Sequence, residues 1–311
     1  MTSNIISGNQ SFTSNGNQKS KTSWELTRAS VDSLAKSIES GHPEALSTYL
    51  GVMARFHTLS AKNCLLIAAQ FPNASHLEGI RSWNELGRFV HPGEKGIYIF
   101  APILAVKNHN QPHPAGHAKK TKGKRSPEPT PEPAQPETQL LGYRGVFVFD
   151  IGQTGGEQLP ESRKSLDVPQ TLERLTAFAT AQGMTIEYAD WLGSKKATSY
   201  RGAIRLLSGM EPAETLPLLL HEVASQVLYS IARRTFVTRA IREQETKAVA
   251  FVVCEALGLE NKDSFADCQL YYGDSRLLGE SLEIVHRAAS TILKAISPDL
   301  ATAANSTQGV N

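Results

Sequence analysis

A segment in the C-terminal half of the chain carries part of a zinc-binding peptidase motif. Residues 218–231 read LLLHEVASQVLYSI. In the motif H-E-x-x-H, two histidines one helical turn apart bind zinc from one helix face, and the glutamate between them is the general base. His221 and Glu222 match this motif, but Ser225 stands where the second histidine is required. Zinc prefers imidazole, thiolate or carboxylate to a serine hydroxyl. The sequence therefore predicts a peptidase-like scaffold whose chemistry is lost or much weakened.

Length and charge set broad limits on the class of protein. The chain has 311 residues, enough for two domains of ordinary size, and a formal net charge of +2. A nucleic-acid surface must therefore be a local patch rather than a property of the whole chain.

The three cysteines, Cys64, Cys254 and Cys268, form no C-x-x-C pair, which favours a reducing cytoplasm. The chain has no apolar run of the about 20 residues that a membrane span needs, and its N-terminus lacks a signal-peptide pattern, so we expect a cytoplasmic protein without a membrane partner.

Low-complexity segments divide the chain. Residues 1–20 are rich in Ser, Asn, Gln and Gly, and residues 107–139 combine Lys-rich and Pro-Glu sequence. Such compositions cannot bury enough apolar surface to fold alone. Since strand-like runs at 96–104 and 143–150 flank the second segment, we interpret it as a disordered insertion at a hairpin tip. The predicted division is a disordered tail (1–20), a first domain (21–160), a second domain (161–297) and a second disordered tail (298–311).

The hydrophobic pattern predicts an α+β fold. Before the insertion the spacing is helical, and after it helices alternate with short strands. Strands first and motif-bearing helices after them is the order expected of a small zincin-like domain. Helices are expected over residues 23–40, 45–54, 60–70, 171–182, 215–232, 239–257 and 279–296, and further strands over 184–189 and 203–207.

An ordered series of sequence blocks resembles a known family, the ArdC-like antirestriction proteins of plasmids and other mobile elements. In the N-terminal half the blocks are RFHTLSAKNCLLI (55–67), WNELGRFVHPGEKGI (83–97) and VFDIGQT (148–154). In the C-terminal half they are His221-Glu222 and EQETKAVAFVV (243–253). The resemblance implies an N-terminal domain that binds single-stranded DNA, followed by a zincin-like metallopeptidase domain. It departs from the family at Ser225, where a second histidine is usual, and at Thr246, where an alanine is usual.

The resemblance also implies a ligand set for a metal. The third ligand of the related enzymes maps to Glu243, with Glu245 as the alternative, so that His221 and Glu243 would be the two remaining ligands. Catalytic zinc normally has three protein ligands. His286 is the other histidine of the C-terminal half, and it joins the site only if the last helix packs across it. We therefore expect no zinc or weakly bound zinc, and a catalytic role for Glu222 only in an active enzyme.

The N-terminal blocks supply a candidate DNA-binding set. Binding to single strands needs cations that follow the phosphates and planar groups that stack on unpaired bases. The plain alternative is that the aromatic residues belong to the core and the basic residues to an ordinary solvated surface. The candidates are Arg55, Lys62, Asn63, Trp83, Arg88 and Lys95.

Three hypotheses of function follow from the sequence. The leading one is single-stranded DNA binding by an antirestriction or mobile-element protein whose metallopeptidase-like domain is inactive. The second is an active zinc metallopeptidase that cleaves a regulatory protein. The third is a scaffold whose zincin-like domain recognises a protein partner without cutting it.

Overall fold

The computed structural model describes residues 23–106, 138–159, 166–231, 237–259, 271 and 273–297. The predicted disordered tails and nearly all of the predicted insertion at 107–139 lie outside these residues. The chain forms two compact units, which we describe separately. The main unit holds the chain up to Ile99 and from Phe147 onward, and the hairpin unit is Phe100–Val146.

Three helices open the main unit and agree with the predicted ones to within one residue at each end. They are α1 (Ser23–Glu39), α2 (Glu44–Arg55) and α3 (Ala61–Gln70). The serine that precedes α3 caps it, since the Ser60 hydroxyl accepts a hydrogen bond from the Asn63 amide (3.2 Å). Capping of this kind involves residues within one turn of each other, so the start of α3 depends on a local signal.

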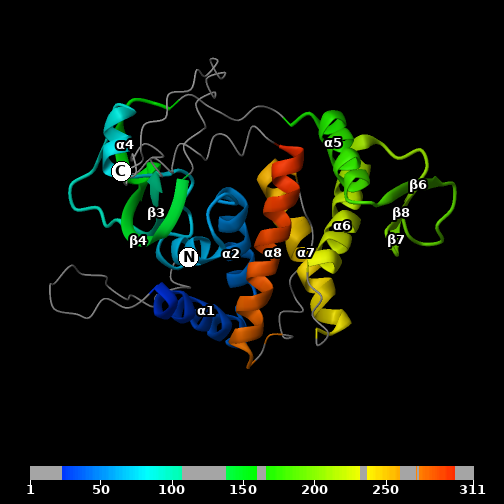
Figure 1. The fold of residues 1–311 in the computed structure, drawn as a ribbon, viewed down its shortest axis with the longest axis horizontal. Helices are drawn as coiled ribbons and strands as arrows, with labels where there is room; N and C mark the ends of the chain where they lie inside the picture. The colour runs from blue at the N-terminus through cyan, green and yellow to red at the C-terminus, as the bar shows by residue number, and fades with distance from the viewer. Residues whose placement is uncertain are drawn as a thin grey trace, which may run out of the picture. The chain divides into compact units, whose positions relative to one another are not determined.

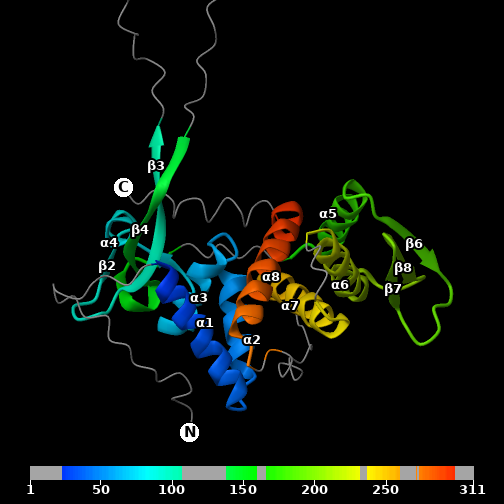
Figure 2. The same cartoon turned by 60° about the horizontal axis from the view of Figure 1, so that its bottom comes forward.

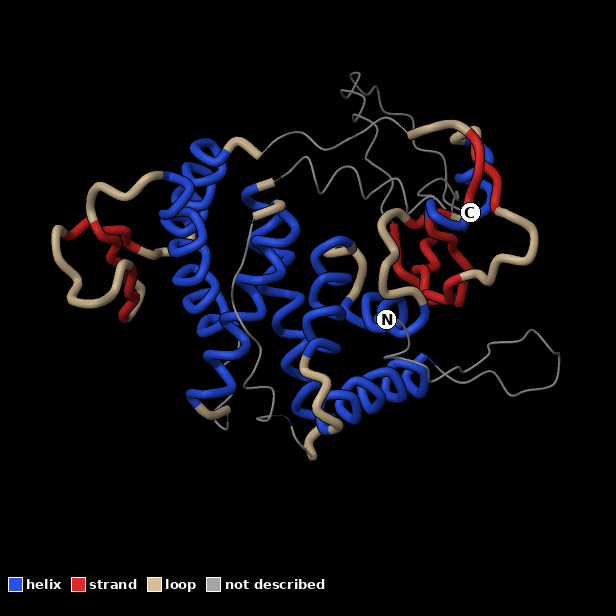
Figure 3. The backbone as a smooth tube through the Cα atoms, turned by 180° about the vertical axis from the view of Figure 1, so that it is seen from behind, coloured by secondary structure: helices blue, strands red, loops and turns tan. Residues whose placement is uncertain are grey.

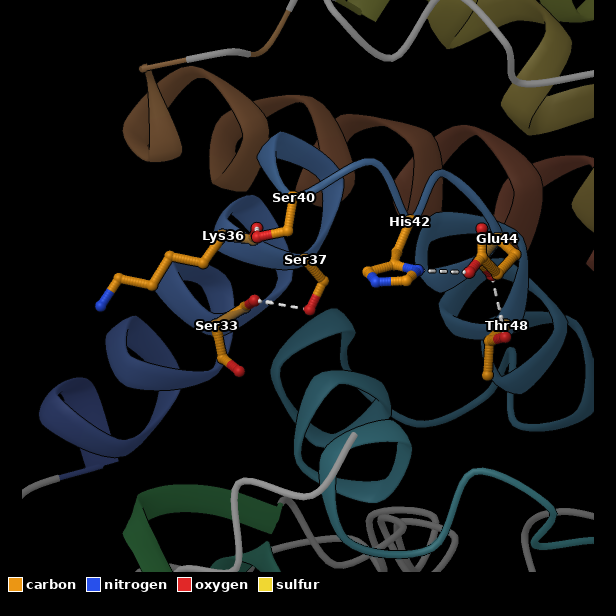
Figure 4. Close-up of polar contacts among 7 residues, drawn as sticks. All are labelled: Ser33, Lys36, Ser37, Ser40, His42, Glu44 and Thr48. Carbon is orange, nitrogen blue, oxygen red and sulfur yellow. Dashed lines mark hydrogen bonds and ion pairs between the residues drawn. The ribbon is translucent and has the colours of Figure 1, made fainter. Parts of the chain in front are cut away.

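Short polar contacts hold the turn between α1 and α2 (Figure 4). Gly41 adopts φ +87°, a left-handed conformation that ends the helix without a Cβ clash. The Ser40 hydroxyl donates to the Lys36 carbonyl (2.8 Å), and His42 Nδ1 lies 2.9 Å from Glu44 Oε1. These contacts satisfy polar groups at the helix ends and set the direction in which α2 leaves the turn.

Five strands and one short α-helix follow the three helices in this part of the chain. Two sheets form here, with strand orders β1-β4-β3 and β2-β5, and helix α4 precedes β2. The neighbouring strands β3 and β4 flank residues 107–137, so the predicted pairing across the insertion is confirmed (Figure 2). The sequence did not predict β1, α4, β2 or β5, all six residues or shorter. The elements are β1 (Leu77–Glu78), α4 (Ile80–Glu85), β2 (Arg88–Val90), β3 (Ile97–Val106), β4 (Thr138–Asp150) and β5 (Thr154–Gly156).

A buried aspartate ties these strands to the preceding loop. Asp150 is 3% exposed, and its carboxylate accepts hydrogen bonds from the amides of Ser75 (2.6 Å), His76 (3.0 Å) and Gly152 (2.8 Å). The Gln153 side chain returns to the Asp150 amide (2.9 Å), which completes a capping box. A buried carboxylate is stable only with such donors, so Asp150 has a structural role.

The second half of the main unit combines helices with a small sheet. In that sheet β6 pairs with β8 in parallel and β7 pairs with β8 antiparallel, beside helices α5 and α6 (Figure 3). The predicted strands and helices of this half are confirmed, with boundary shifts of up to four residues, and β7 was not predicted. The elements are α5 (Val168–Ala181), β6 (Thr185–Ala189), β7 (Ala197–Tyr200), β8 (Ala203–Leu207), α6 (Pro212–Ile231), α7 (Arg239–Leu257) and α8 (Ser275–Ile296).

Helices from both halves of the sequence share one core. Helix α7 packs against α2, α6 and α8, and α8 also packs against α1 and α5 (Figure 1). The α+β class is confirmed, and within it the first helices of the chain pack directly on the last ones. Among the described helices, none is long and apolar enough to cross a membrane.

Two histidines lie in this shared core or at its edge. His57 follows α2 and is 7% exposed, and His286 of α8 has a buried Nε2 that lacks a hydrogen-bond partner. The Ser290 hydroxyl donates to the His57 carbonyl (2.7 Å), which joins α8 to the same loop. Desolvation lowers the pKa of both rings, and the charge of Lys294 lowers both further. Hydrogen bonds to the backbone of Ala54 (His57) and of Leu59 (His286) oppose these pKa shifts only in part.

From the lowered pKa values of these two histidines we expect the protein to lose stability in mild acid. Because each folded-state pKa is lowered, the unfolded chain binds more protons, so the free energy of unfolding falls as the pH drops through about 6.5. The slope is at most about 1.4 kcal/mol per pH unit for each histidine. Urea unfolding of the wild type and of the His57→Gln/His286→Gln variant, between about pH 8 and pH 5, measures it. The same slope in both proteins would contradict this assignment.

Candidate functional site

A pocket of about 540 Å³ lies where α6, α7 and the turn between β7 and β8 meet. Ligand pockets commonly have volumes of about 300–1,000 Å³. Helix α6 reaches the pocket with one face while its other face enters the core through Leu216, Leu219, Leu220 and Val223, which are at most 1% exposed. The residues lining the pocket are Ser199, Tyr200, Arg201, His221, Ser225, Gln226, Leu228, Val237, Arg239, Arg242, Glu243, Glu245 and Thr246.

Five positions singled out in the sequence line this one pocket: His221, Ser225, Glu243, Glu245 and Thr246. His221 and Ser225 lie one helical turn apart on α6, and Glu243 comes from α7. The half-buried Glu222 does not line the pocket. Glu245 does, but it is 2% exposed and its Oε1 accepts a hydrogen bond from the Ser281 hydroxyl of α8 (2.6 Å). Glu245 is therefore engaged in helix packing, whereas Glu243 is exposed.

The metal-ligating side chains in the pocket do not fit a catalytic zinc ion. Such an ion needs three protein ligands within bonding distance of one point. Within the described ranges, no three His, Cys, Asp or Glu side chains come together in this way. His286 lies elsewhere, beside His57 and the backbone of Leu59.

Three arginines that the sequence did not single out line the same pocket. Arg239 and Arg242 come from the first turn of α7, and Arg201 comes from the β7–β8 turn. Their separation in sequence hid them, because the pocket forms only when the turn meets α7. Arg201 and Gly202 both have positive φ (47° and 87°) between the paired residues Tyr200 and Ala203. This is a two-residue hairpin turn of the kind that favours Asn and Gly, so an arginine here is unusual.

Two of the candidate DNA-binding residues lie in the core. Trp83 is 0% exposed, and its indole Nε1 donates a hydrogen bond to the Phe149 carbonyl (3.0 Å). Asn63 is 5% exposed at the start of α3. Stacking on a base requires an accessible ring face, which Trp83 lacks. In this structure both residues are surrounded by the core.

Two arginines of the same set make backbone contacts. Arg55 donates to the Pro72 carbonyl (2.6 Å), and desolvation is the main cause that lowers its pKa. Arg88 donates to the hydroxyl (2.9 Å) and carbonyl (3.0 Å) of Thr154 and to the Glu157 carbonyl, so it joins β2 to β5. Its guanidinium carbon lies 5.9 Å from the centroid of the buried Trp83 ring. These two cations therefore stabilise turns and strands.

The remaining candidates, Lys62 and Lys95, are exposed. Phe89 is 55% exposed and makes an edge contact with His91 (5.8 Å between ring centroids). Phe147 is 52% exposed and covers Gly96, where an added Cβ would lie 2.9 Å from the Phe147 Cβ. We call the set Phe89, His91, Lys95 and Phe147 the turn surface. Phe89, His91 and Lys95 lie within residues 89–95, and Phe147 of β4 lies over Gly96, which follows them.

Hydrogen bonds hold the turn surface in place. The Gln153 side chain donates to Glu94 Oε2 and to the Lys95 carbonyl (both 2.9 Å), and the His91 amide donates to the Gln153 carbonyl (3.0 Å). Beside it, Gly156 has φ +122° and an added Cβ would lie 2.4 Å from the Gly87 carbonyl oxygen, so the β2–β5 pair needs glycine there. The sequence did not single out Phe89 or Phe147, because the exposure of an apolar side chain depends on which distant segments pack over it.

The hairpin unit by itself also exposes apolar side chains. Leu141 is 64% exposed and Tyr143 is 65% exposed. Strands of a two-stranded ribbon have few neighbours to cover their faces. These residues carry no role assigned from the sequence.

Comparisons with known proteins place the fold near one solved structure. No protein-family profile matches the chain. An uncharacterised protein of Bacillus anthracis is 23% identical over 284 residues, which cover 82% of this chain and 48% of that protein. The chain thus matches about half the length of this relative. Two crystal structures of the antirestriction protein ArdC from plasmid R388 are similar to this chain. The Mn(II)-bound structure gives a TM-score of 0.45 at 17% identity and covers 80% of this chain and 98% of that chain. The metal-free structure gives a TM-score of 0.51 at 17% identity and covers 88% of this chain and 98% of that chain, so this protein has an ArdC-like fold.

Proposed function

We propose that this protein binds single-stranded DNA with little sequence preference, as an ArdC-like antirestriction protein, and that its peptidase-like pocket does not hydrolyse peptides. The observation that carries the DNA-binding proposal is the turn surface, where Phe89 and Phe147 are both more than half exposed and Lys95 is exposed as well. A single exposed ring is ordinary, whereas exposed apolar side chains grouped on one surface can mark an interaction site. Stacking on unpaired bases would bury both rings, while Lys95 contacts a phosphate.

The ArdC-like fold supports the antirestriction part of the proposal, since the protein of known structure carries that name. The exposed Lys62 on α3 is a further candidate phosphate contact. Arg55 and Arg88 would have to exchange their hydrogen bonds with Pro72 and Thr154 to reach DNA. We therefore assign DNA contact to the turn surface and Lys62.

Binding of the full chain to labelled oligo(dT), followed by fluorescence anisotropy, tests the proposal. Phe89→Ala/Phe147→Ala should weaken binding at least about tenfold, because stacking contributes about 1–3 kcal/mol per base. Lys95→Gln should reduce the salt slope by about 0.7 log units of affinity per log unit of salt, the value for one phosphate contact on single strands.

The matched control is Trp191→Ala, which removes an aromatic ring that is 81% exposed in the β6–β7 connection. It should leave oligo(dT) binding unchanged, since Trp191 lies outside the turn surface. Wild-type protein that fails to bind oligo(dT) at low salt would contradict the function, and an equal loss in both variants would contradict this placement of the site.

The inactive-pocket part of the proposal is supported by the missing third ligand. With His221 and Glu243 alone, Glu222 has no metal-activated water to deprotonate, because lowering the pKa of water to about 7 depends on a bound ion. An active zinc metallopeptidase is the competing function, and a scaffold that binds a protein partner without cutting it is the third. Metal analysis separates the competing enzyme from the other two.

A further inference from the structure

The pocket between α6 and α7 has the charge balance of an anion site. Three guanidinium groups line it, against the carboxylates of Glu243 and Glu245, and Glu245 already accepts the Ser281 hydroxyl. Within the part of the chain that the structure describes, Arg239 and Arg242 form no ion pair. Like charges that line one cavity without partners repel each other, so an arriving anion is stabilised and an arriving divalent cation is opposed.

The number of arginines favours phosphate over carboxylate. A carboxylate carries one negative charge and is satisfied by one bidentate arginine. A phosphate monoester carries a charge of about −1.5 to −2 at neutral pH and three acceptor oxygens, so it can engage several guanidinium groups at once. His221, Ser225 and Gln226 offer further hydrogen-bonding groups in the same cavity.

The volume and the ring beside the arginines favour more than a bare phosphate. A pocket of about 540 Å³ exceeds what one phosphate group fills. Tyr200 lines the pocket, is 71% exposed and has the Arg201 guanidinium carbon 5.2 Å from its ring centroid. Leu228 and Val237 add apolar lining. An exposed ring with an arginine over it is a surface on which a nucleobase can stack.

We propose that this pocket binds a nucleoside monophosphate, with its phosphate against Arg239, Arg242 and Arg201 and its base against Tyr200. The nucleotide is either free or the 5′-phosphorylated end of a DNA strand. The site is separate from the turn surface, so it stands whether or not the turn surface binds DNA. Arginine at position 201, where a turn residue such as Asn or Gly would be favoured, is explained by its place beside this pocket.

Calorimetric titration of the full chain with dAMP, inorganic phosphate and deoxyadenosine tests the proposal. Wild type should bind dAMP more tightly than inorganic phosphate, and deoxyadenosine at least about tenfold more weakly than dAMP. Arg239→Gln/Arg242→Gln should weaken dAMP and phosphate alike by at least about tenfold. Tyr200→Ala should weaken dAMP alone, and Arg201→Gly should weaken both ligands while keeping a residue suited to the turn.

Arg205→Gln is the control, because Arg205 lies on the adjacent strand β8 and its Nε is 3.0 Å from Glu187 Oε2, outside the pocket. It should bind dAMP as the wild type does. Competition with 5′-phosphorylated and 5′-hydroxyl oligonucleotides distinguishes the two sources: only the phosphorylated strand displaces dAMP if strand ends bind, and neither does if the ligand is free. Wild type that binds neither dAMP nor phosphate, dAMP binding unchanged in Arg239→Gln/Arg242→Gln, or stronger displacement by a peptide carboxylate would overturn the proposal.

Discussion

Replacing Trp83 by alanine is expected to lower the free energy of unfolding by about 3–5 kcal/mol, the range for a large aromatic side chain removed from a core. Trp83 is 0% exposed, and its ring lies 5.2 Å from the His76 ring. The change also leaves the Phe149 carbonyl without the indole donor, which adds the cost of an unsatisfied buried acceptor. Urea unfolding followed by circular dichroism measures the difference.

The same substitution at Trp191 is the matched control. This ring is 81% exposed, so Trp191→Ala should change the free energy of unfolding by no more than about 0.5 kcal/mol. Trp83→Phe should fall between the two, since it keeps most of the apolar volume but loses the indole donor. If Trp83→Ala were as stable as Trp191→Ala, the assignment of Trp83 to the core, and with it the loss of a base-stacking role, would not hold.

Local patterns were sufficient for the long elements of this fold. Helix α7 forms over the predicted residues, Arg239–Leu257. In the structure Thr238 caps its start and Gly258, at φ +72°, ends it. Both signals lie within a few residues of the boundary that they set. The short strands β1, β2 and β5 have no such signal, since each is three residues or shorter and exists only through pairing with a distant segment.

The candidate sites also combine features set by nearby residues, which the sequence predicts, with features set by distant segments, which it does not. Helical spacing placed His221 and Ser225 on one face, and the structure has both in one pocket. Exposure could not be predicted, because it depends on which distant segment covers a side chain. Trp83 and Phe89 lie six residues apart in one sequence block, yet Trp83 is 0% exposed while Phe89 is 55% exposed. The pocket arginines show the same limit, since Arg201 and Arg242 line one pocket only because distant segments pack together.

The substitution Ser225→His is expected to convert a pocket with two metal donors into one that holds zinc. A histidine at this position lies one helical turn from His221, so both imidazoles project towards the pocket that Glu243 also lines. Three protein ligands are the set found in catalytic zinc sites. Zinc content, measured on purified protein by mass spectrometry, should rise from a small fraction to near one ion per chain, and Glu243→Ala in the same background should reverse the gain.

Gln226→His is the control for position, because it adds an imidazole to the same pocket but out of register with His221. It should raise zinc content far less than Ser225→His. The arginines supply a second check: since positive charge opposes a cation, adding Arg242→Gln to Ser225→His should tighten zinc binding further. Peptide hydrolysis is not expected to return with the metal alone, because residues around the ligands also orient them. Near-stoichiometric zinc in the wild type that disappears in His221→Ala would instead establish a working metal site and favour the metallopeptidase function.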